Sequence, residues 1–340
     1  MLTISAAEVD RALTFPGLVE TLRTAFREGA VQPVRHHHAV ERPDGAASTL
    51  LLMPAWTDFH AAGGSAGGHI GVKIVTVSPD NNAIGKPAVM GLYLLLDGGT
   101  GEPEALIDGQ RLTQWRTACA SALAASYLAR DDASRLLVVG AGALSPFLAK
   151  AHSAVRPIKT IRIWNRTPAN AEKVAADLCA EGFAASAATD LDAELGQADI
   201  VSSATITTKP LVKGTLLRPG THVDLVGGFT PTMRESDDDA IMRARVYVDT
   251  RAGATKEAGD IVQPLASGVL KPEAIVADLH ELARGQKQGR GSPDEITLFK
   301  SVGAALEDLA AGIAVYKALR GSSKPVWRPS PLRLGRNRPR

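Results

Sequence analysis

The stretch Arg135-Leu-Leu-Val-Val-Gly140-Ala-Gly-Ala-Leu-Ser-Pro146 decides the fold class of this 340-residue chain. It starts as an apolar run typical of a buried strand and continues after Pro146 into an alanine-rich segment typical of a helix. Gly140, Gly142 and Ser145 have the G-x-G-x-x-small spacing of a dinucleotide-binding turn. The first glycine permits a tight turn, the second lets the backbone approach a pyrophosphate, and the helix N-terminus supplies unpaired N–H groups. We therefore predict cofactor contacts at Gly140, Ala141, Gly142, Ala143 and Leu144.

The sequence around this turn alternates between short apolar runs and helical segments. The helical pattern is clearest at 168–181, where Ala171, Val174 and Leu178 recur on one face. Buried strands are predicted at 135–140, 160–165, 199–204, 221–227 and 245–249. This alternation predicts an α/β fold with a Rossmann-type, doubly wound parallel sheet.

Residues before about position 120 follow a different pattern, with strand-like runs separated by Gly and Pro. Strands are predicted at 48–56, 69–77 and 89–97, and helices at 5–12, 16–28 and 113–129. Near the other end of the chain, a further helix is predicted at 303–319. The end of the chain, 320–340, combines basic residues with prolines, which favours a disordered tail over a nucleic-acid-binding arm. An N-terminal α+β domain is therefore expected beside the Rossmann-type domain.

The composition excludes several classes of protein. The 38 basic and 36 acidic residues leave a formal charge of +2, which gives no reason to expect a nucleic-acid partner. No apolar run approaches the ~20 residues that a membrane helix needs, and the N-terminus lacks a basic leader segment. The cysteines, Cys119 and Cys179, have neither the spacing of metal ligands nor that of a redox pair. We expect a cytoplasmic protein with no membrane partner.

The end of the second predicted parallel strand indicates which dinucleotide binds. NAD sites usually carry Asp or Glu here for the ribose hydroxyl, whereas this chain reads Asn165-Arg166-Thr167. The Arg166 guanidinium is suited to a 2′-phosphate; the alternative is a surface arginine without that role. We predict NADPH as the preferred cofactor, with NADH also accepted, and contacts from Asn165, Arg166 and Thr167.

Three cations in the N-terminal part occupy positions that folding alone does not explain. Arg116 falls in the first turn of a helix if Thr113 is the N-cap, where the helix dipole disfavours a cation. Lys73 shares a strand face with Val75, unless it protects a sheet edge. Together with Arg35, these cations are predicted to bind a substrate carboxylate.

The run His36-His37-His38 does not predict a metal site. Successive side chains of a strand alternate, so only His36 and His38 share a face, and no Cys or carboxylate pair nearby completes a ligand set. We expect no bound metal. His36 and His38 stay open as proton donors to a substrate or as structural histidines.

Seven short motifs occur in order along the chain. They are Val31-Gln-Pro-Val-Arg35, Leu52-Met-Pro-Ala-Trp56, Gly71-Val-Lys-Ile-Val75, Leu112-Thr-Gln-Trp-Arg-Thr-Ala118, Gly140-Ala-Gly-Ala-Leu144, Trp164-Asn-Arg-Thr167 and Phe299-Lys-Ser-Val-Gly303. As a set, they resemble the ornithine cyclodeaminase/μ-crystallin family. The resemblance implies a homodimer built by the N-terminal domain and an active site in the cleft between the two domains.

The resemblance also implies domain bounds and residue roles. It implies a dimerisation and substrate domain at 1–118, a dinucleotide-binding domain at 119–306, a completing C-terminal helix at 307–325 and a basic tail at 326–340. The implied substrate contacts are Arg35, Lys73, Arg116, Phe229 and Val302, with Lys73 and Arg116 as the catalytic residues. Further implied cofactor contacts are Arg116, Thr205, Val226, Gly227 and Ser301.

One segment departs from the family pattern. Cyclodeaminases and related alanine dehydrogenases carry a proton-transferring Asp after the fifth strand, but this chain reads Gly227-Gly228-Phe229 there. A cofactor-contacting lysine of the family is also lost, with Met233 near its place. Without the acid, an amino acid has no proton acceptor, and an anion grip with a hydride donor remains. The sequence therefore resembles the ketimine reductase branch, which implies NAD(P)H-dependent reduction of Δ1-pyrroline-2-carboxylate to L-proline or of Δ1-piperideine-2-carboxylate to L-pipecolate.

Two alternatives stay open. An ornithine cyclodeaminase or alanine-type dehydrogenase would need another acid, and Asp224 in a predicted strand is a candidate. A non-catalytic, NADPH-dependent binding protein is the second alternative, as the crystallin branch of the family shows.

Overall fold

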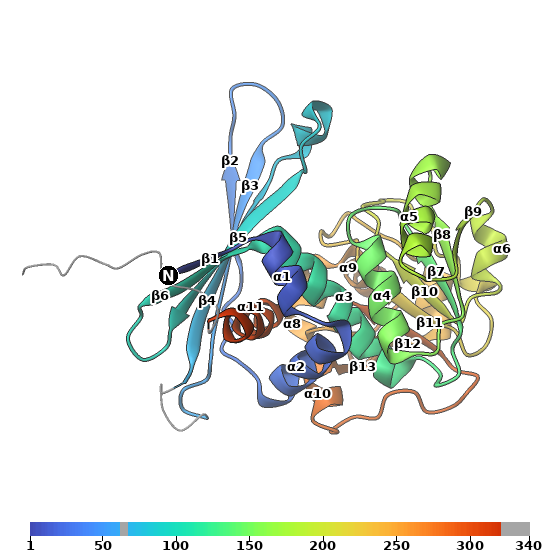
Figure 1. Ribbon diagram of the computed structural model, residues 1–340. Coiled ribbons are helices and arrows are strands. Elements are labelled where there is room, and N and C mark those ends of the chain that lie inside the picture. Colours follow the sequence, from blue (N-terminus) through green and yellow to red (C-terminus); the bar gives the residue numbers. More distant parts are fainter. Residues whose placement is uncertain (62–66, 321–340) are drawn as a thin grey trace, which may run out of the picture.

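The N-terminal part of the protein is built around a six-stranded sheet. The computed structural model describes residues 1–61 and 67–320, and Figure 1 shows this sheet on the left, with the last helix against it. In sheet order its strands are β1 (Leu2–Ile4), β6 (Pro103–Asp108), β5 (Val89–Asp97), β4 (His69–Val77), β3 (Ser48–Trp56) and β2 (His36–Val40). Only β1 and β6 pair in parallel; the other neighbours are antiparallel. The three strands predicted in this region are confirmed with the predicted bounds.

The alternation of side chains along β4 places Lys73 on the inner face of this sheet. Gly71, Lys73 and Val75 are buried, whereas Ile74 on the opposite face is 38% exposed. β4 pairs with β3 on one side and β5 on the other, so the alternative that Lys73 protects a sheet edge is wrong. A buried lysine in an interior strand needs a partner of opposite charge.

Helices cover the inner face of the first sheet. They are α1 (Ala6–Ala12), α2 (Phe15–Glu28), α3 (Gly109–Leu128) and α11 (Ala305–Leu319). The Tyr93 side chain of β5 packs between β4 and α11. An added Cβ at Gly71 would lie 1.8 Å from its hydroxyl oxygen, and one at Gly312 would lie 2.6 Å from its ring. Helix α11 thus returns to the first sheet (Figure 1). Positions 321–325 of the predicted helix and the predicted tail at 326–340 lie outside the described residues.

The long helix α3 begins earlier than the sequence predicted. Its N-cap is Asp108, whose side chain accepts a hydrogen bond of 2.8 Å from the Arg111 backbone N–H. β6 therefore turns directly into the helix, and Thr113 lies inside it. Arg116 lies about two turns from the start of the helix, so the expected conflict between its charge and the helix dipole does not arise. The prediction of Thr113 as the cap was wrong because Asp108 is also the last residue of a strand.

The second half of the protein is a doubly wound sheet of eight parallel strands. In sheet order they are β13 (Ile275–Asp278), β12 (Ala244–Val248), β14 (Ile296–Lys300), β11 (His222–Leu225), β10 (Ile200–Ser203), β7 (Arg135–Val139), β8 (Thr160–Trp164) and β9 (Ala185–Ala188). The Rossmann-type fold class is confirmed, and the five strands predicted here end within two residues of the predicted bounds. β9, β13 and β14 were missed; β14 is fully buried although it ends in a lysine.

Helices cover both faces of the second sheet, which Figure 1 shows on the right. They are α4 (Ser145–Val155), α5 (Pro168–Ala180), α6 (Leu191–Leu195), α7 (Asp238–Arg243), α8 (Arg251–Glu257), α9 (Gly259–Ser267) and α10 (Leu279–Ala283), with 3₁₀ turns at Pro79–Ile84, Gly214–Leu216 and Pro272–Ala274. The chain winds outward from β7 through β8 and β9, and then in the opposite direction from β10. Ligands of such sheets bind at this reversal, outside the carboxyl ends of the strands. Within the described residues, every helix is too short or too polar to cross a membrane.

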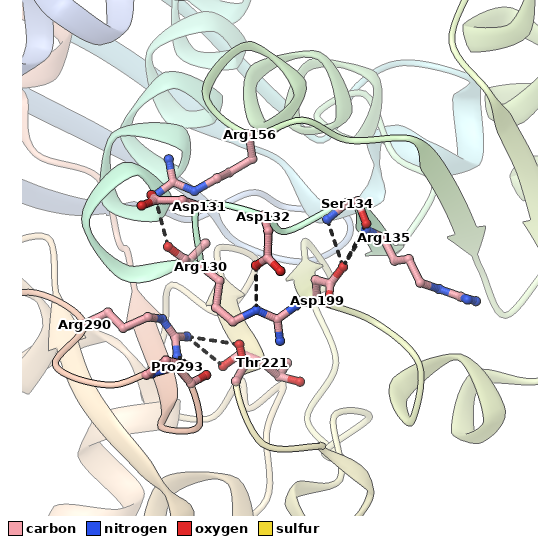
Figure 2. A network of polar contacts seen from close by, with 12 residues as sticks. Arg130, Asp131, Asp132, Ser134, Arg135, Arg156, Asp199, Thr221, Arg290 and Pro293 are labelled. Atoms are coloured by element: carbon pink, nitrogen blue, oxygen red, sulfur yellow. Dashed lines mark hydrogen bonds and ion pairs between the residues drawn. The ribbon is translucent and has the colours of Figure 1, made fainter.

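The buried carboxylate of Asp199 lies at the amino ends of the strands of this sheet and holds two of them in place (Figure 2). Asp199 Oδ2 accepts hydrogen bonds of 2.8 and 2.9 Å from the backbone N–H groups of Ser134 and Arg135. Its Oδ1 accepts one of 2.7 Å from Arg130, which also binds the exposed Asp132. Because these residues precede β7 and β10, the network aligns the amino ends of two neighbouring strands.

Candidate active site

The glycine turn after β7 leaves room for a ligand at the carboxyl edge of the second sheet. Gly140 has a φ of +108°, and a Cβ there would lie 2.8 Å from the Ala204 carbonyl oxygen, so only glycine fits. A Cβ on Gly142 would meet nothing within 4 Å. Ser145 Oγ donates a 2.8 Å hydrogen bond to the Gly140 oxygen, and no side chain caps the start of α4. This combination of an open turn and free helix N–H groups fits a dinucleotide pyrophosphate.

The end of β8 supports the glycine turn from one side. The Ala141 backbone N–H donates to Asn165 Oδ1 at 3.2 Å, and Asn165 Nδ2 donates to the Thr167 oxygen at 3.0 Å. Arg166 is exposed, and it has no hydrogen-bond or ion-pair partner in the described part of the chain. The predicted cofactor residues Asn165, Arg166 and Thr167 therefore lie together beside the turn.

The loops after β10 and β11 lie on the other side of the glycine turn from β8, at the carboxyl ends of the strands. A Cβ on Gly140 would lie 3.2 Å from Thr205 Cγ2, and a Cβ on Gly227 would lie 2.0 Å from the Thr205 oxygen. The two loops and the glycine turn are thus in direct contact. Val226 is buried, and Phe229 follows in the same loop and is half-buried.

Lys73 and Arg116 meet at two acidic residues of α11. Lys73 Nζ lies 2.7 Å from Asp308 Oδ2, and Arg116 Nε lies 3.0 Å from Asp308 Oδ1. Arg116 Nη1 binds Glu307 Oε2 at 2.8 Å. Lys73 is 2% exposed and Arg116 6%, so the water that would otherwise screen their charges is almost absent. The sequence paired the two cations correctly in space but did not identify the acids that hold them.

Burial changes the protonation of this cluster. It lowers the pKa of Lys73 from 10.5 to about 8, with Arg116 adding to the effect. Burial raises the pKa of Glu307 from 4.5 to about 7, although Arg116 opposes the shift. Burial would also raise the pKa of Asp308, but Arg116 and Lys73 together outweigh it and lower that pKa. Asp308 therefore stays ionised between the two cations.

Arg35 completes the group of predicted cations. Its Nη2 donates to the carbonyl oxygens of Gly303 at 2.7 Å and Val302 at 3.3 Å. Gly303 has a φ of +83°, and a Cβ there would lie 2.4 Å from Arg116 Nη1. The segment after β14 thus lies between Arg35 and Arg116: Gly303 is beside both cations, and Val302 is beside Arg35.

Two further acids, which the sequence analysis missed, bind the segment after β14 and Arg35. Asp249, after β12, accepts hydrogen bonds of 2.7 Å from the backbone N–H groups of Val302 and Gly303, and one of 3.2 Å from Ser301 Oγ. Glu257, at the end of α8, lies 3.1 Å from Arg35 Nη2, and burial raises its pKa. The position of Asp249 at a strand's carboxyl end was a usable signal. Nothing in the sequence around Glu257 pointed to the site.

The other candidates from the sequence do not form sites. Asp224 is fully buried and accepts hydrogen bonds from Ser121 at 2.9 Å and Ser202 at 2.6 Å, with His152 at 3.2 Å. It is therefore a structural carboxylate, and it is not available as the base of a deaminase. His36 and His38 are exposed on the outermost strand β2. The described residues contain no group of His, Cys, Asp and Glu side chains that would hold a metal.

Comparison with known families places this site in context. The model of the ornithine cyclodeaminase/mu-crystallin family matches residues 1–323. The chain belongs to this family. A Δ1-pyrroline-2-carboxylate reductase from Paracoccus denitrificans is 37% identical over 302 residues, which cover 88% of this chain and 95% of the relative.

Solved structures of other proteins have a similar fold. A Thermococcus litoralis Δ1-pyrroline-2-carboxylate reductase, in complex with NADH and L-proline, superposes with a TM-score of 0.88 at 32% identity. The match covers 94% of this chain and 98% of that one. An archaeal alanine dehydrogenase dimer with bound NAD has a TM-score of 0.84 at 28% identity, over 94% of this chain and 96% of the other.

Proposed function

We propose that this protein reduces Δ1-pyrroline-2-carboxylate to L-proline, and Δ1-piperideine-2-carboxylate to L-pipecolate, with NADPH preferred over NADH. The chain is a nicotinamide-dependent oxidoreductase that acts on C=N bonds. Its substrate and its preferred cofactor are proposed. One observation carries the proposal. Arg35 and Arg116 lie beside Gly303, which follows a strand of the sheet whose glycine turn fits a dinucleotide, and Asp308 joins Lys73 to Arg116.

The cations supply an anion grip for the substrate carboxylate. Asp308 and Glu307 engage Nε and Nη1 of Arg116, and no described residue accepts from its Nη2. Lys73 has three donors, and the structure gives it one acidic partner, Asp308. A carboxylate placed on these donors is held in a nearly dry site, where a charge-assisted hydrogen bond is strong. The acids of α11 orient the grip.

Glu257 is suited to hold the proton that the imine nitrogen takes up. It lies beside Arg35, and burial raises its pKa, which favours a proton on the carboxyl group. Asp224 is engaged in a buried network, and His36 and His38 are exposed on β2. We propose Glu257 in this role, which replaces His36 and His38 as the candidate donor.

The loop after β11 argues against a deaminase. The family's acid is replaced by Phe229, and the neighbouring Asp224 is engaged in a buried network. Phe229 has no carboxylate, and the carboxylate of Asp224 is therefore not available to take a proton from an amino acid. The remaining groups grip an anion and protonate an imine, which suits a preformed ketimine.

The cofactor fits residues on both sides of the glycine turn. Gly140 to Leu144 would hold the pyrophosphate, Arg166 a 2′-phosphate, and Thr205, Val226, Gly227 and Ser301 the nicotinamide half. When bound, the reduced nicotinamide supplies the hydride for the imine carbon. The chain's own contribution is to fix the carboxylate so that this carbon lies within reacting distance.

We also propose the assembly and location of the protein. Ile74, Met90 and Leu92 are 38%, 42% and 48% exposed on the outer side of the first sheet, which suits a homodimer interface there. We propose a dimerisation and substrate domain at 1–118, completed by the C-terminal helix, and a dinucleotide-binding domain at 119–306. Helix α3 belongs to both domains. The two free cysteines are consistent with a cytoplasmic location.

A single assay tests the reaction. Purified protein is mixed with NADPH and Δ1-pyrroline-2-carboxylate, and the loss of nicotinamide absorbance is followed; a second sample contains NAD and ornithine. We expect turnover in the first sample and no ammonia in the second. Ammonia release from ornithine would refute the proposal, and absence of turnover in both would favour a binding protein.

A further inference from the structure

A buried ionic cluster lies beneath the loops that follow β10 and β11. Its members are Glu235, Lys300 and Asp260, whose side chains are all fully buried. Lys300 Nζ lies 3.1 Å from Asp260 Oδ2 and 3.5 Å from Glu235 Oε2. Burying three ionisable groups is costly, and an apolar cluster of similar volume would often be at least as stable. The cluster therefore calls for a reason other than stability.

The two oxygens of Glu235 serve two different loops. Oε1 accepts hydrogen bonds from Ser203 Oγ at 2.7 Å, from the Thr205 backbone N–H at 2.8 Å and from Thr205 Oγ1 at 3.0 Å. Oε2 accepts from the backbone N–H groups of Gly227 at 2.7 Å and Gly228 at 3.1 Å. One carboxylate thus joins the ends of β10 and β11.

Asp260 and Lys300 hold Glu235 from below. Asp260 Oδ1 accepts hydrogen bonds from the backbone N–H groups of Glu235 at 2.8 Å and Ser236 at 2.9 Å. Lys300 is the last residue of β14, and Ser301 follows it directly. Burial raises the pKa of Glu235, whereas the Lys300 ammonium opposes this shift and favours the carboxylate.

The place of these loops relative to the glycine turn indicates what they border. The loop after β10 touches Gly140, and the loop after β11 touches Thr205, so they extend away from the turn on one side. Asn165 and Arg166 lie on the other side of the turn, after β8. A dinucleotide whose pyrophosphate lies on the turn spans both sides. If its adenosine half lies at Arg166, its nicotinamide half lies over the loops held by Glu235.

We propose that Glu235 is a positioning residue whose carboxylate holds the loops after β10 and β11 in the shape that binds the nicotinamide half of the cofactor. The assignment rests on the proposed function for the identity of the cofactor. An ionised carboxylate is needed because it only accepts hydrogen bonds, and all its partners in the loops are donors. An amide would turn an NH₂ group toward one of the loops.

The variant Glu235→Gln tests this role without leaving a net buried charge, because Lys300 and Asp260 still form a balanced pair. Dissociation constants of wild type and variant are measured for NADPH and for 2′,5′-ADP, which carries only the adenosine half. We expect a weakening of about tenfold or more for NADPH and less than twofold for 2′,5′-ADP. The matched control is Glu194→Gln, which changes a carboxylate bound to Arg162 away from these loops. We expect it to change neither constant.

Equal weakening of both ligands, or unchanged NADPH binding, would overturn the proposal. If Glu235→Gln does not fold, Glu235→Asp takes its place, because it keeps the charge but is too short to reach both loops. We expect it to weaken NADPH binding and to leave 2′,5′-ADP binding unchanged. If Glu235→Asp binds both ligands as tightly as the wild type, the proposal is overturned. None of these measurements uses the imine. If the protein binds NADPH but does not reduce Δ1-pyrroline-2-carboxylate, the proposed substrate is wrong. The role of Glu235 is still decided by the binding constants.

Discussion

Lys73 and Arg116 show how single residues are tuned by their surroundings. Both are cations in a nearly dry cluster, and Asp308 lies between them at 2.7 and 3.0 Å. Arg116 cannot lose its charge in the working range, whereas burial lowers the pKa of Lys73 to about 8. The anion grip therefore contains one permanent charge and one that titrates.

The titration of Lys73 predicts a pH dependence of substrate binding. Below about pH 8 the ammonium is charged and helps to bind the carboxylate; above it, the charge is lost, so KM for the imine should rise. Lys73→Arg keeps the charge at all these pH values, so its KM, relative to its own value at pH 7, should stay flat from pH 7 to 9. Parallel profiles for the two proteins would show that Lys73 does not cause the change.

Arg166 should decide between the two cofactors. It is exposed and free of partners among the described residues, so a 2′-phosphate gains a charge-assisted contact there. Arg166→Ala should raise KM for NADPH roughly ten- to a hundredfold and leave KM for NADH almost unchanged. Steady-state kinetics with both cofactors measure this. Equal losses would mean that Arg166 does not bind the 2′-phosphate.

At the scale of elements, the amino ends and the carboxyl ends of the parallel strands have different roles. At the amino ends of the strands, Asp199 aligns β7 and β10, and Arg290 lies beside Thr221 (Figure 2). Arg290 donates to the Gly220 oxygen at 3.2 Å, in the loop before β11. Arg290 also donates to the Leu128 oxygen at 2.7 Å, at the end of α3, where a cation is favoured. The carboxyl edge carries the glycine turn and the loops beside it. Stability and ligand binding are thus separated along each strand.

This separation predicts that Asp199→Ala destabilises the protein without changing the site. Two backbone N–H groups and Arg130 would lose their acceptor, which should lower the free energy of unfolding by about 2–4 kcal/mol. Denaturant unfolding measures the loss, and kcat at a permissive temperature should be unchanged. Asp132→Ala is the control, because that side chain is 80% exposed and its pairing contributes within about 0.5 kcal/mol. A similar stability for both variants would contradict the role of Asp199.

At the scale of the whole molecule, α11 connects the two halves of the chain. It follows β14 of the second sheet, yet it packs in the core of the first (Figure 1). Its first turn carries Glu307 and Asp308, so the element that closes the fold also holds the cations of the site. Among the described residues, none covers the outer face of the first sheet at Ile74 and Leu92, which lie opposite each other on β4 and β5.

The proposed homodimer predicts that a charge on this face separates the subunits. Leu92→Asp would bury a carboxylate in an apolar interface, so light scattering should show a monomer where the wild type is a dimer. Met242→Asp is the control, because Met242 is 61% exposed on α7 and far along the chain from this sheet. A monomeric wild type, or a Leu92→Asp variant that stays dimeric, would rule out this face as the interface.

The sequence by itself determined the Rossmann-type class and the glycine turn. These follow from local rules: the period of apolar residues and the steric needs of a turn. The sequence also singled out Lys73 and Arg116, but its local reason for Arg116, a position in the first turn of a helix, was wrong. Its error on the start of α3 was also local, because two capping residues, Asp108 and Thr113, competed and only strand β6 decided between them.

Only the tertiary structure decided which acids complete the site. Asp308 and Glu307 are about 190 residues from Arg116 along the chain, and Glu257 is more than 200 from Arg35. No periodicity or motif spacing records such pairs, because they depend on how two sheets and a returning helix pack. The same holds for Glu235, which lies eight residues after Gly227 but also binds Thr205, thirty residues earlier. The partners of a buried charge are set by packing, and packing is a property of the folded chain.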